Sequence, residues 1–311
     1  MKLLVTGASG FIGHNVLLRA PREWDIVAVY NRTPGLEQFV TAHGLSHVRP
    51  VKCDLLNEDD VKSLARVMGG TPDAMLYLAA NGDPAASAER PRWDLESNTV
   101  ALVTCLEHCP ADHVVYLSSG AVYDGLSGSV SPASAVSPRL PYAISKLASE
   151  HYLRFFAEQR GSVGSYINVR FFGAYGPYEA ARKITTRWLT AMAAGQREFV
   201  VRGDGGNLID FMYVADAVDG FLALVTARGT RATVDFASGA PVTVNEVVRT
   251  MARILGADVT IRNEGTVAEY IEFRSVDTAM RGQFDVKPAR SFEDGLRELQ
   301  GFLQRSSLRR G

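Results

Sequence analysis

A tyrosine and a lysine four residues apart could carry out proton transfer. The segment YAISK, from Tyr142 to Lys146, begins a predicted helix over residues 142–156, so the phenol and the ammonium project from one face. A free tyrosine has a pKa of ~10, and a nearby ammonium favours the phenolate and lowers that value. Ser119 follows a predicted strand at residues 113–117 and could hydrogen-bond a substrate oxygen beside Tyr142. On spacing alone, an amphipathic surface helix is the commoner explanation, so the pair gains its weight from its position in the chain.

A glycine-rich turn, TGASGFIG, joins the first predicted strand at residues 3–6 to a predicted helix at residues 12–19. Glycine permits the positive φ angles of a tight turn and lets a pyrophosphate approach the backbone, and free N–H groups at the start of the helix complement its charge. A plain glycine-rich turn is the alternative, but the strand before it and the helix after it favour dinucleotide binding. The expected cofactor contacts in this turn are Gly7, Ser9, Gly10, Phe11, Ile12 and Gly13.

The end of the second predicted strand, residues 25–29, distinguishes between the two nicotinamide cofactors. An acidic residue there hydrogen-bonds the ribose 2′-OH of NAD, whereas an arginine accommodates the 2′-phosphate of NADP. The segment Tyr30-Asn31-Arg32 contains no acid, and Arg32 is well placed for a phosphate, with a solvated surface arginine as the alternative. The sequence therefore favours NADP over NAD. With either cofactor, Lys146 could hold the nicotinamide ribose hydroxyls, and the oxidised ring would help to lower the Tyr142 pKa.

Short apolar strands alternate with longer helical patterns in the first half of the chain, which is typical of parallel-sheet units. Further strands are predicted at residues 74–79 and 166–171, and further helices at 58–67 and 98–107. Beyond Pro177 the rhythm changes, with predicted helices at 184–194, 214–226 and 244–255 and predicted strands at 198–201 and 258–261. Residues 125–141 are rich in Ser, Pro and Gly and are expected to form a loop that could cover a ligand.

Composition and charge exclude several other classes of protein. The chain of 311 residues has 33 Lys and Arg against 34 Asp and Glu, a net charge of -1, and so lacks the basic field that attracts nucleic acid. No apolar run approaches the ~18 residues of a membrane span, and the N-terminus carries no secretory signal, so a soluble cytoplasmic protein is expected. The cysteines Cys53, Cys105 and Cys109 have no CxxC spacing, which argues against disulfides. A zinc site with His108 and His113 is disfavoured against buried cysteines in an apolar helix, so no metal is expected.

Several motifs together resemble one family. They are Thr6–Gly13 (TGASGFIG), Ser118–Tyr123 (SSGAVY), Tyr142–Lys146, Arg170–Pro177 (RFFGAYGP) and Gly203–Val214 (GDGGNLIDFMYV). Over nearly its whole length the chain resembles an extended short-chain dehydrogenase/reductase, specifically of the nucleotide-sugar epimerase/dehydratase/reductase family. The fold that this implies is α/β, a doubly wound, Rossmann-like parallel sheet with a smaller C-terminal substrate domain. Residues 1–172 with parts of 207–240 are expected to bind the dinucleotide, and residues 173–206 with 241–311 the substrate.

The resemblance also implies roles for particular residues. Asp54 and Leu55 would contact the adenine, and Ser119, Tyr142 and Lys146 would be catalytic. The remaining implied contacts lie along the cofactor and at its nicotinamide end: Leu78, Ala79, Ala80, Asn98, Phe172 and Gly173.

Three departures from the family limit what the resemblance supports. Sugar 4,6-dehydratases have an Asp-Glu pair where this chain has Gly120-Ala121, so elimination of water lacks its acid and base. The substrate-contacting Asn of the family is Gly173 here, and the Arg that commonly grips a pyrophosphate is Ile209. Other bases could hold the pyrophosphate, and the candidates are Arg187, Arg202 and Arg274. Otherwise the substrate is not a standard nucleotide sugar.

The predicted function is NAD(P)-dependent oxidoreduction of a sugar that is nucleotide-linked, of the 4-ketoreductase or epimerase type, in a protein that resembles homodimeric enzymes. A reductase of small non-sugar carbonyls is the alternative, favoured by Ile209 and opposed by the segment GDGGNLIDFMYV. A non-catalytic scaffold that keeps the cofactor is less favoured, because Ser119, Tyr142 and Lys146 are all present.

Overall fold

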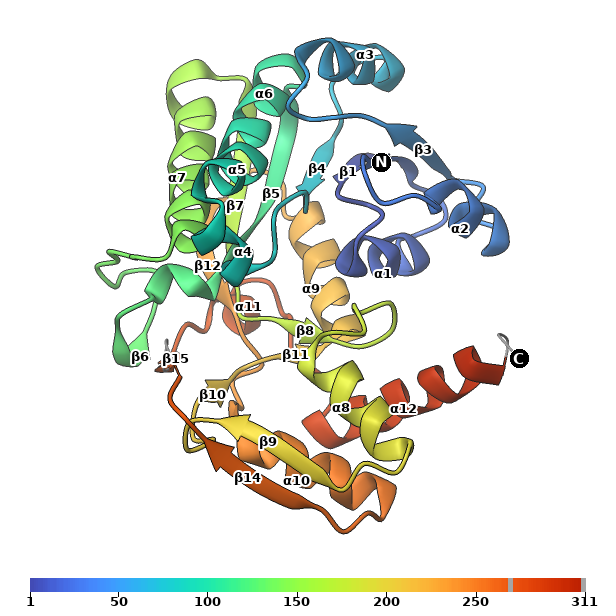
Figure 1. The fold of residues 1–311 in the computed structure, drawn as a ribbon. Helices are drawn as coiled ribbons and strands as arrows, with labels where there is room; N and C mark the ends of the chain where they lie inside the picture. The colour runs from blue at the N-terminus through green and yellow to red at the C-terminus, as the bar shows by residue number, and fades with distance from the viewer. Residues whose placement is uncertain (268–270, 309–311) are drawn as a thin grey trace.

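A parallel sheet of seven strands forms the body of the molecule in the computed structural model, which describes residues 1–267 and 271–308 (Figure 1). Its strand order is β12-β7-β5-β4-β1-β2-β3, and every neighbouring pair is parallel. The strands are β1 (Lys2–Thr6), β2 (Asp25–Tyr30), β3 (Val48–Lys52), β4 (Ala74–Tyr77), β5 (Ala111–Ser119), β7 (Val163–Phe171) and β12 (Arg231–Phe236). The order reverses between β1 and β4, so the predicted doubly wound sheet is confirmed.

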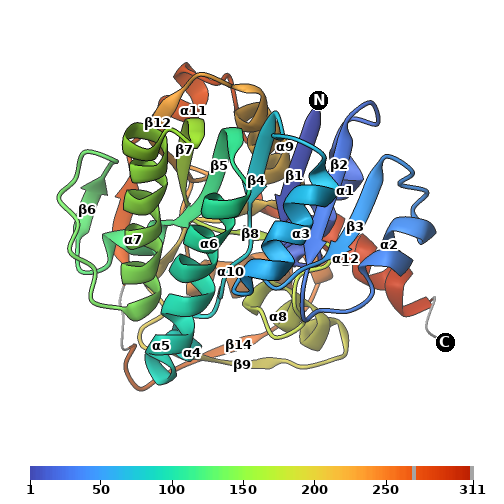
Figure 2. The same ribbon diagram turned by 90° about the horizontal axis from the view of Figure 1, so that it is seen from above.

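Helices cover both faces of this sheet, because successive residues of its strands alternate between two apolar cores. Leu3 and Val5 of β1 join the core under α1 (Phe11–Arg19), α2 (Leu36–Ala42) and α9 (Val214–Thr226). Leu4 joins the core under α3 (Glu58–Met68), α6 (Ala101–His108) and α7 (Pro141–Phe155). Figure 2 shows α3, α6 and α7 side by side on one face, with α9 on the other. Strands buried on both sides in this way read as continuous apolar runs in the sequence.

A smaller unit lies beyond the carboxyl ends of the strands and has a core of its own (Figure 1). Its helix α10 begins with a capping box, in which Thr243 and Glu246 satisfy each other's backbone N–H groups. The unit contains α8 (Ile184–Ala193), β9 (Glu198–Arg202), β10 (Leu208–Ile209), β13 (Val242–Thr243), α10 (Val244–Leu255), β14 (Thr260–Glu264) and α12 (Phe292–Leu308).

Short elements connect the two units. Two parallel strands, β8 (Ala174–Tyr175) and β11 (Met212–Tyr213), lead from the large sheet into the smaller unit. The other short elements are α4 (Pro84–Glu89), α5 (Pro91–Leu95), η1 (Glu96–Val100), η2 (Gly120–Tyr123), η3 (Phe156–Arg160) and α11 (Ala279–Gly282). Part of the helix predicted at residues 98–107 is therefore the π-helical turn η1, which continues into α6.

The expected loop at residues 125–141 contains a strand, which corrects the prediction for that segment. β6 (Ser127–Val130) pairs in parallel with β15 (Glu272–Ser275), far away in the sequence. Its residues, SGSV, have no alternating apolar pattern, so only the pairing with β15 defines the strand.

Nothing in the described part of the chain is long and apolar enough, as a helix, to cross a membrane. Within the same residues, no group of three or more metal-ligating side chains comes together. Cys53, Cys105 and Cys109 are free, buried thiols.

Candidate active site

The glycine-rich turn between β1 and α1 leaves no room for side chains at two of its positions. Gly7 has a φ of 66°, and a Cβ there would lie 2.8 Å from the backbone nitrogen of Ala79. A Cβ on Gly13 would lie 2.5 Å from the carbonyl oxygen of Ala8. α1 begins after Gly10 without a side-chain cap, so the N–H groups of its first turn are free for an anionic ligand. This close-packed cradle at a helix N-terminus fits the pyrophosphate of a dinucleotide.

The other predicted cofactor contacts follow the carboxyl ends of neighbouring strands. The N–H groups of Leu78 and Ala79 donate to Thr6 Oγ1 at 3.1 and 3.2 Å, so the segment after β4 is fixed beside the glycine turn. Asp54 and Leu55 follow β3, and Arg32 is exposed two residues beyond β2. All of these residues line the same edge of the sheet, where doubly wound folds bind their ligands.

Strand β5 and helix α7 bring Ser119, Tyr142 and Lys146 together. β5 ends at Ser119, whose hydroxyl is near enough to Tyr142 to lower the pKa of that tyrosine. α7 begins at Pro141, and the Tyr142 backbone N–H donates to Ser87 Oγ at 3.1 Å, which caps the helix. One turn further, Lys146 Nζ donates to the carbonyl oxygen of Leu117 at 2.7 Å and lies 5.9 Å from the centroid of the Tyr142 ring.

Burial dominates the protonation of both titratable groups in this trio. Burial raises the pKa of Tyr142, an effect that the neighbouring Ser119 hydroxyl opposes. Burial lowers the pKa of Lys146 to about 8, while the nearby carboxylates of Asp94 and Glu150 favour the ammonium. In the protein alone, Tyr142 is thus a neutral phenol, and a lowered pKa with oxidised nicotinamide bound stays a prediction. A neutral phenol is the form that donates a proton.

A buried polar cluster lies behind Tyr142 and Lys146. The Asp94 carboxylate accepts hydrogen bonds from Asn81, Asn98 and Ser145 at 2.7, 2.9 and 2.7 Å. Asn98 was expected beside the nicotinamide, but its side chain is completely buried and all its bonds are within this cluster. The Asn98 side chain therefore joins η1 to α7 through Ser145, and its place beside the nicotinamide stays a prediction. The sequence reasoning missed Asp94, which stands in the polar segment PRWDLES and looks like a surface acid.

A second buried network braces the same strand and helix from the opposite side. Arg170 on β7 forms an ion pair with Glu150 on α7 at 2.9 Å, and Ser118 Oγ donates to Glu150 at 2.5 Å. Arg170 also donates to the Tyr123 hydroxyl at 3.1 Å, and that hydroxyl donates to Asp235 on β12 at 2.7 Å. These bonds fix the strand end that carries Ser119 against the helix that carries Lys146.

Two of the residues at which this chain departs from the family pattern, Gly120 and Gly173, are explained by their surroundings in the structure. Gly120 is packed against the Phe172 ring, and a Cβ there would lie 3.1 Å from it. Phe172 also contacts the rings of Tyr123 and Phe273, so it belongs to a small apolar cluster at the site. Gly173 has a φ of 133°, a conformation that only glycine adopts without strain, so an asparagine would not fit this backbone.

The three arginines proposed to hold a pyrophosphate lie on three separate elements. Arg187 is on α8, Arg202 ends β9, and Arg274 is on β15, and all three are exposed. Arg274 is in the strand that pairs with β6, next to Ser275, which donates to Asp235 at 2.7 Å. Ile209, where the family has its arginine, is half-buried on β10.

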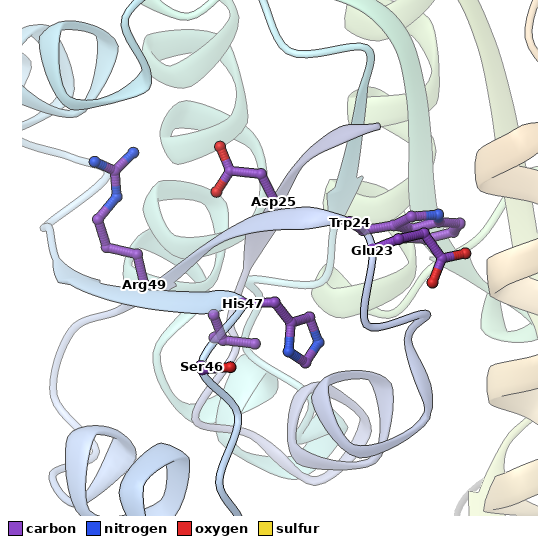
Figure 3. A pocket seen from close by; sticks show the side chains of 7 residues that line it. Glu23, Trp24, Asp25, Ser46, His47 and Arg49 are labelled. Carbon is purple, nitrogen blue, oxygen red and sulfur yellow. The ribbon is translucent and has the colours of Figure 1, made fainter.

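Two cavities are lined by residues other than Ser119, Tyr142 and Lys146. One of about 370 Å³ lies at the amino-terminal ends of β2 and β3, lined by residues that include Trp24, His47 and Arg49 (Figure 3). Ser119 and Tyr142 lie at the opposite edge, at the carboxyl ends of the strands. A second cavity of about 200 Å³ lies between the end of β12 and β15, lined in part by Asp235 and Asp277.

Comparison with known proteins agrees with this geometry. The description "NAD dependent epimerase/dehydratase family" belongs to a family model that matches residues 3–235. The uncharacterized UDP-glucose epimerase YtcB of Bacillus subtilis (strain 168) is 27% identical over 330 residues, covering 100% of both chains. A dTDP-4-dehydro-6-deoxy-D-allose reductase of a Streptomyces species is 29% identical, covering 93% of each chain.

Solved structures of such proteins share the fold. The structure of MoeE5 in complex with UDP-glucose and NAD is 26% identical and covers 99% of this chain and 100% of its own, with a TM-score of 0.85. The UDP-glucose 4-epimerase of Thermotoga maritima has a TM-score of 0.88 at 22% identity, covering 99% of this chain and 100% of its own. The match of the family model, over a glycine-rich cofactor turn and a Ser-Tyr-Lys trio at one sheet edge, shows that the chain belongs to the NAD dependent epimerase/dehydratase family.

Proposed function

We propose that the protein transfers hydride between a nicotinamide dinucleotide and C4 of a nucleotide-linked sugar, as a 4-ketoreductase or a 4-epimerase. The observation that carries this proposal is the grouping of Ser119, Tyr142 and Lys146 at the sheet edge that also holds the glycine turn, with Lys146 Nζ 5.9 Å from the centroid of the Tyr142 ring. We propose that residues 1–172 with parts of 207–240 bind the dinucleotide, and that residues 173–206 with 241–311 bind the substrate.

The residues of this chain divide the proton chemistry among them. The dinucleotide, held by the turn from Gly7 to Gly13, supplies or accepts the hydride when it is bound. In reduction, the Tyr142 hydroxyl gives its proton to the carbonyl oxygen of the sugar while Ser119 hydrogen-bonds that oxygen. In oxidation, Tyr142 takes the proton of the sugar hydroxyl, and the Lys146 ammonium favours the resulting phenolate. Epimerisation combines both steps on opposite faces of the same keto sugar.

The Tyr142→Phe variant tests this assignment, because it removes the proton donor and keeps the ring. Activity should fall by about 10²–10⁴-fold, the usual contribution of general acid–base catalysis, with an unchanged circular dichroism spectrum. Tyr166→Phe is a control, since it removes the hydroxyl of a tyrosine on β7 that donates to Glu158, away from the trio. Turnover by Tyr142→Phe near the rate of the control would show that Tyr142 is not the acid.

We propose NADP as the preferred cofactor, with NAD as the alternative. Arg32 is exposed just beyond β2, and the segment Tyr30-Asn31-Arg32 has no acid to repel a 2′-phosphate. The MoeE5 complex contains NAD, which keeps the alternative open for a relative at 26% identity. Titration of both cofactors into the wild-type protein and an Arg32 variant separates the two possibilities.

We propose that the sugar is linked to a nucleoside diphosphate. Arg274, which is exposed on β15, is the first candidate for binding its pyrophosphate. Arg187 and Arg202 are the other candidates. A thermal-shift screen against UDP, dTDP, GDP and CDP, repeated with Arg274→Ala, tests this. Stabilisation of the wild-type protein by one nucleotide, lost in the variant, is the expected result.

Ile209 supports a second candidate function, reduction of a small non-sugar carbonyl. A half-buried isoleucine cannot hold a pyrophosphate, so a substrate without phosphate would need no replacement for the missing arginine. Failure of all four nucleotides to stabilise the protein, together with turnover of small ketones, would favour this function.

We propose that the partner is a second copy of the chain, docked on α7 and its neighbour. Five exposed apolar side chains lie on α7 and on the adjoining α5 and η1: Leu95, Val100, Ile144, Tyr152 and Phe155. Light scattering should show a dimer that Phe155→Glu dissociates, while Val276→Glu, at another exposed apolar residue, leaves it intact.

A cytoplasmic location, which we also propose, agrees with the three free thiols.

A further inference from the structure

The Asp94 carboxylate is completely buried and is surrounded by hydrogen-bond donors. Its Oδ1 accepts from Asn81 Nδ2 at 2.7 Å and from Asn98 Nδ2 at 2.9 Å, and its Oδ2 accepts from Ser145 Oγ at 2.7 Å. A charged group is rarely buried this deeply without a paired cation, and here the bonded partners are neutral.

The orientation of both amides is fixed by further bonds, which leaves them only as donors to Asp94. Asn98 Oδ1 accepts from the backbone N–H of Asn81 at 2.6 Å, and Asn81 Oδ1 accepts from the N–H of Asp83 at 2.9 Å. An NH₂ group can only donate, so the two groups that meet Oδ1 need an acceptor there. Three donors therefore converge on the Asp94 carboxylate.

The cluster joins this charge to the catalytic helix. Ser145 stands between Tyr142 and Lys146 on α7, and its Oγ also lies 3.0 Å from the carbonyl oxygen of Tyr142. Thr99 Oγ1 donates to the Ser145 carbonyl oxygen at 2.9 Å, so η1 holds the same turn. Asp94 therefore contacts the turn of α7 that sets the positions of both catalytic side chains.

Lys146 needs a compensating charge because its ammonium is almost completely buried, with a relative exposure of 3%. The titratable or charged groups around it are Tyr142 and Glu150 on α7, Tyr116 on β5, where Nζ lies 5.1 Å from the ring centroid, and Asp94. Glu150 already forms an ion pair with Arg170 on β7. Asp94 is thus the carboxylate near Lys146 whose bonded partners carry no positive charge.

We propose that Asp94 is a positioning residue for the catalytic pair: its buried charge keeps the Lys146 side chain protonated, and its bond to Ser145 holds the turn that carries Tyr142 and Lys146. The inference rests on the proposed role of Lys146 in catalysis. Its electrostatic part concerns only the chain itself and can be tested without substrate.

Lys146 loses its proton close to neutral pH, so removal of the Asp94 charge should change its protonated fraction measurably. Burial lowers the Lys146 pKa to about 8, and Asp94 is the first of the groups that oppose the shift. Loss of an opposite charge at short range shifts a pKa by roughly 1 unit. At pH 7.5 the protonated fraction of Lys146 would then fall from about three quarters to about one quarter.

The experiment is a pH titration of the protein, labelled with ¹³C at lysine Cε, followed by NMR. The chain has six lysines, and loss of one signal in Lys146→Met assigns the resonance of interest. Asp94→Asn removes the charge and can keep every hydrogen bond. The new NH₂ group can donate to Ser145 Oγ, and the Ser145 hydroxyl can then donate to the carbonyl oxygen of Tyr142. The Lys146 pKa should fall by roughly 1 unit in this variant. Asp94→Ser is titrated as well, so that the result does not depend on the folding of one variant.

Two comparisons separate charge from structure. Glu96→Gln neutralises a half-buried carboxylate two residues after Asp94, which is ion-paired with Arg92, and should leave the Lys146 pKa unchanged. The exchange variant Asp94→Asn with Asn98→Asp keeps one buried charge in the cluster and should restore the pKa towards the wild-type value. In activity measurements, the high-pH limb of the profile should move to lower pH by the same amount as the NMR titration.

An unchanged Lys146 pKa in folded Asp94→Asn or Asp94→Ser would overturn the proposal. A loss of activity with no shift of either titration would likewise overturn it, because Asp94 would then act only through packing. A shifted titration in a protein without sugar-nucleotide turnover would support the role of Asp94 and count against the proposed function instead.

Discussion

The ion pair between Glu150 and Arg170 allows a quantitative test of what holds the active site together. Both side chains are buried, with 5% and 6% exposed, and they are joined by hydrogen bonds of 2.9 to 3.3 Å. Replacing only one partner leaves the other charge in the interior without compensation, which costs about 3–5 kcal/mol. Since a whole domain is stable by only ~5–15 kcal/mol, either Glu150→Leu or Arg170→Met should remove a large part of the free energy of unfolding.

The double variant Glu150→Leu/Arg170→Met should behave differently from the sum of its parts. Removing both charges eliminates the desolvation cost together with the attraction, so its stability should lie within about 2 kcal/mol of the wild-type protein. Urea denaturation of the four proteins, followed by circular dichroism at pH 7, gives the coupling energy, which should be at least about 3 kcal/mol. Additivity of the two single variants to within about 0.5 kcal/mol would refute this reasoning, as would a cost below about 1 kcal/mol for each.

Four further predictions follow from local geometry. Arg32→Ala should weaken NADP binding by about tenfold to a hundredfold, the worth of one charge-assisted hydrogen bond, and leave NAD binding nearly unchanged; equal losses in cofactor titrations would remove the NADP preference. Gly13→Ala places a Cβ 2.5 Å from the backbone oxygen of Ala8 and should weaken the binding of both cofactors by about tenfold or more. In the same titration, Gly10→Ala should have less effect, because its Cβ would lie 3.2 Å from its nearest neighbour, the Gly7 oxygen. Burial raises the pKa of Asp235 to about 6, so the folded protein binds this proton more tightly than the unfolded chain. The stability that this proton contributes is present below about pH 4 and is lost as the pH rises through about 6. Denaturation of Asp235→Asn at pH 4.5 and 7.5 should lack this dependence. No nucleotide hexose should lose water in the presence of this protein, because Gly120-Ala121 supplies neither acid nor base; a product lighter by one water in mass spectrometry would show another source of these groups.

Local signals in the sequence were sufficient to predict the large sheet and the grouping of Ser119, Tyr142 and Lys146 at its edge. The glycine turn lies between a strand and a helix as predicted, and the predicted helices at residues 214–226 and 244–255 have the bounds of α9 and α10. These elements have apolar runs or helical periodicity strong enough to define them without tertiary contacts.

Features created by distant contacts could not be predicted in this way. β6 exists because β15 pairs with it, and neither strand has an apolar pattern of its own. Asp94 and Asn98 carry polar side chains that a sequence pattern assigns to the surface or to a ligand, yet both are completely buried. Only the packing of η1 against α7 determines that their hydrogen bonds are made to each other and to Ser145.

The position of β12 at the edge of the large sheet affects how the chain can fold. The strand and α9, which covers one face of the sheet, come from residues 214–236, after α8, β9 and β10 of the smaller unit. A fragment that stops at residue 172 would leave β7 as an unpaired edge and would expose the apolar residues that α9 covers, such as Val115 and Ile167. Such edges and patches promote aggregation. On the ribosome, the seven-stranded sheet therefore cannot be completed until residue 236 has been synthesised.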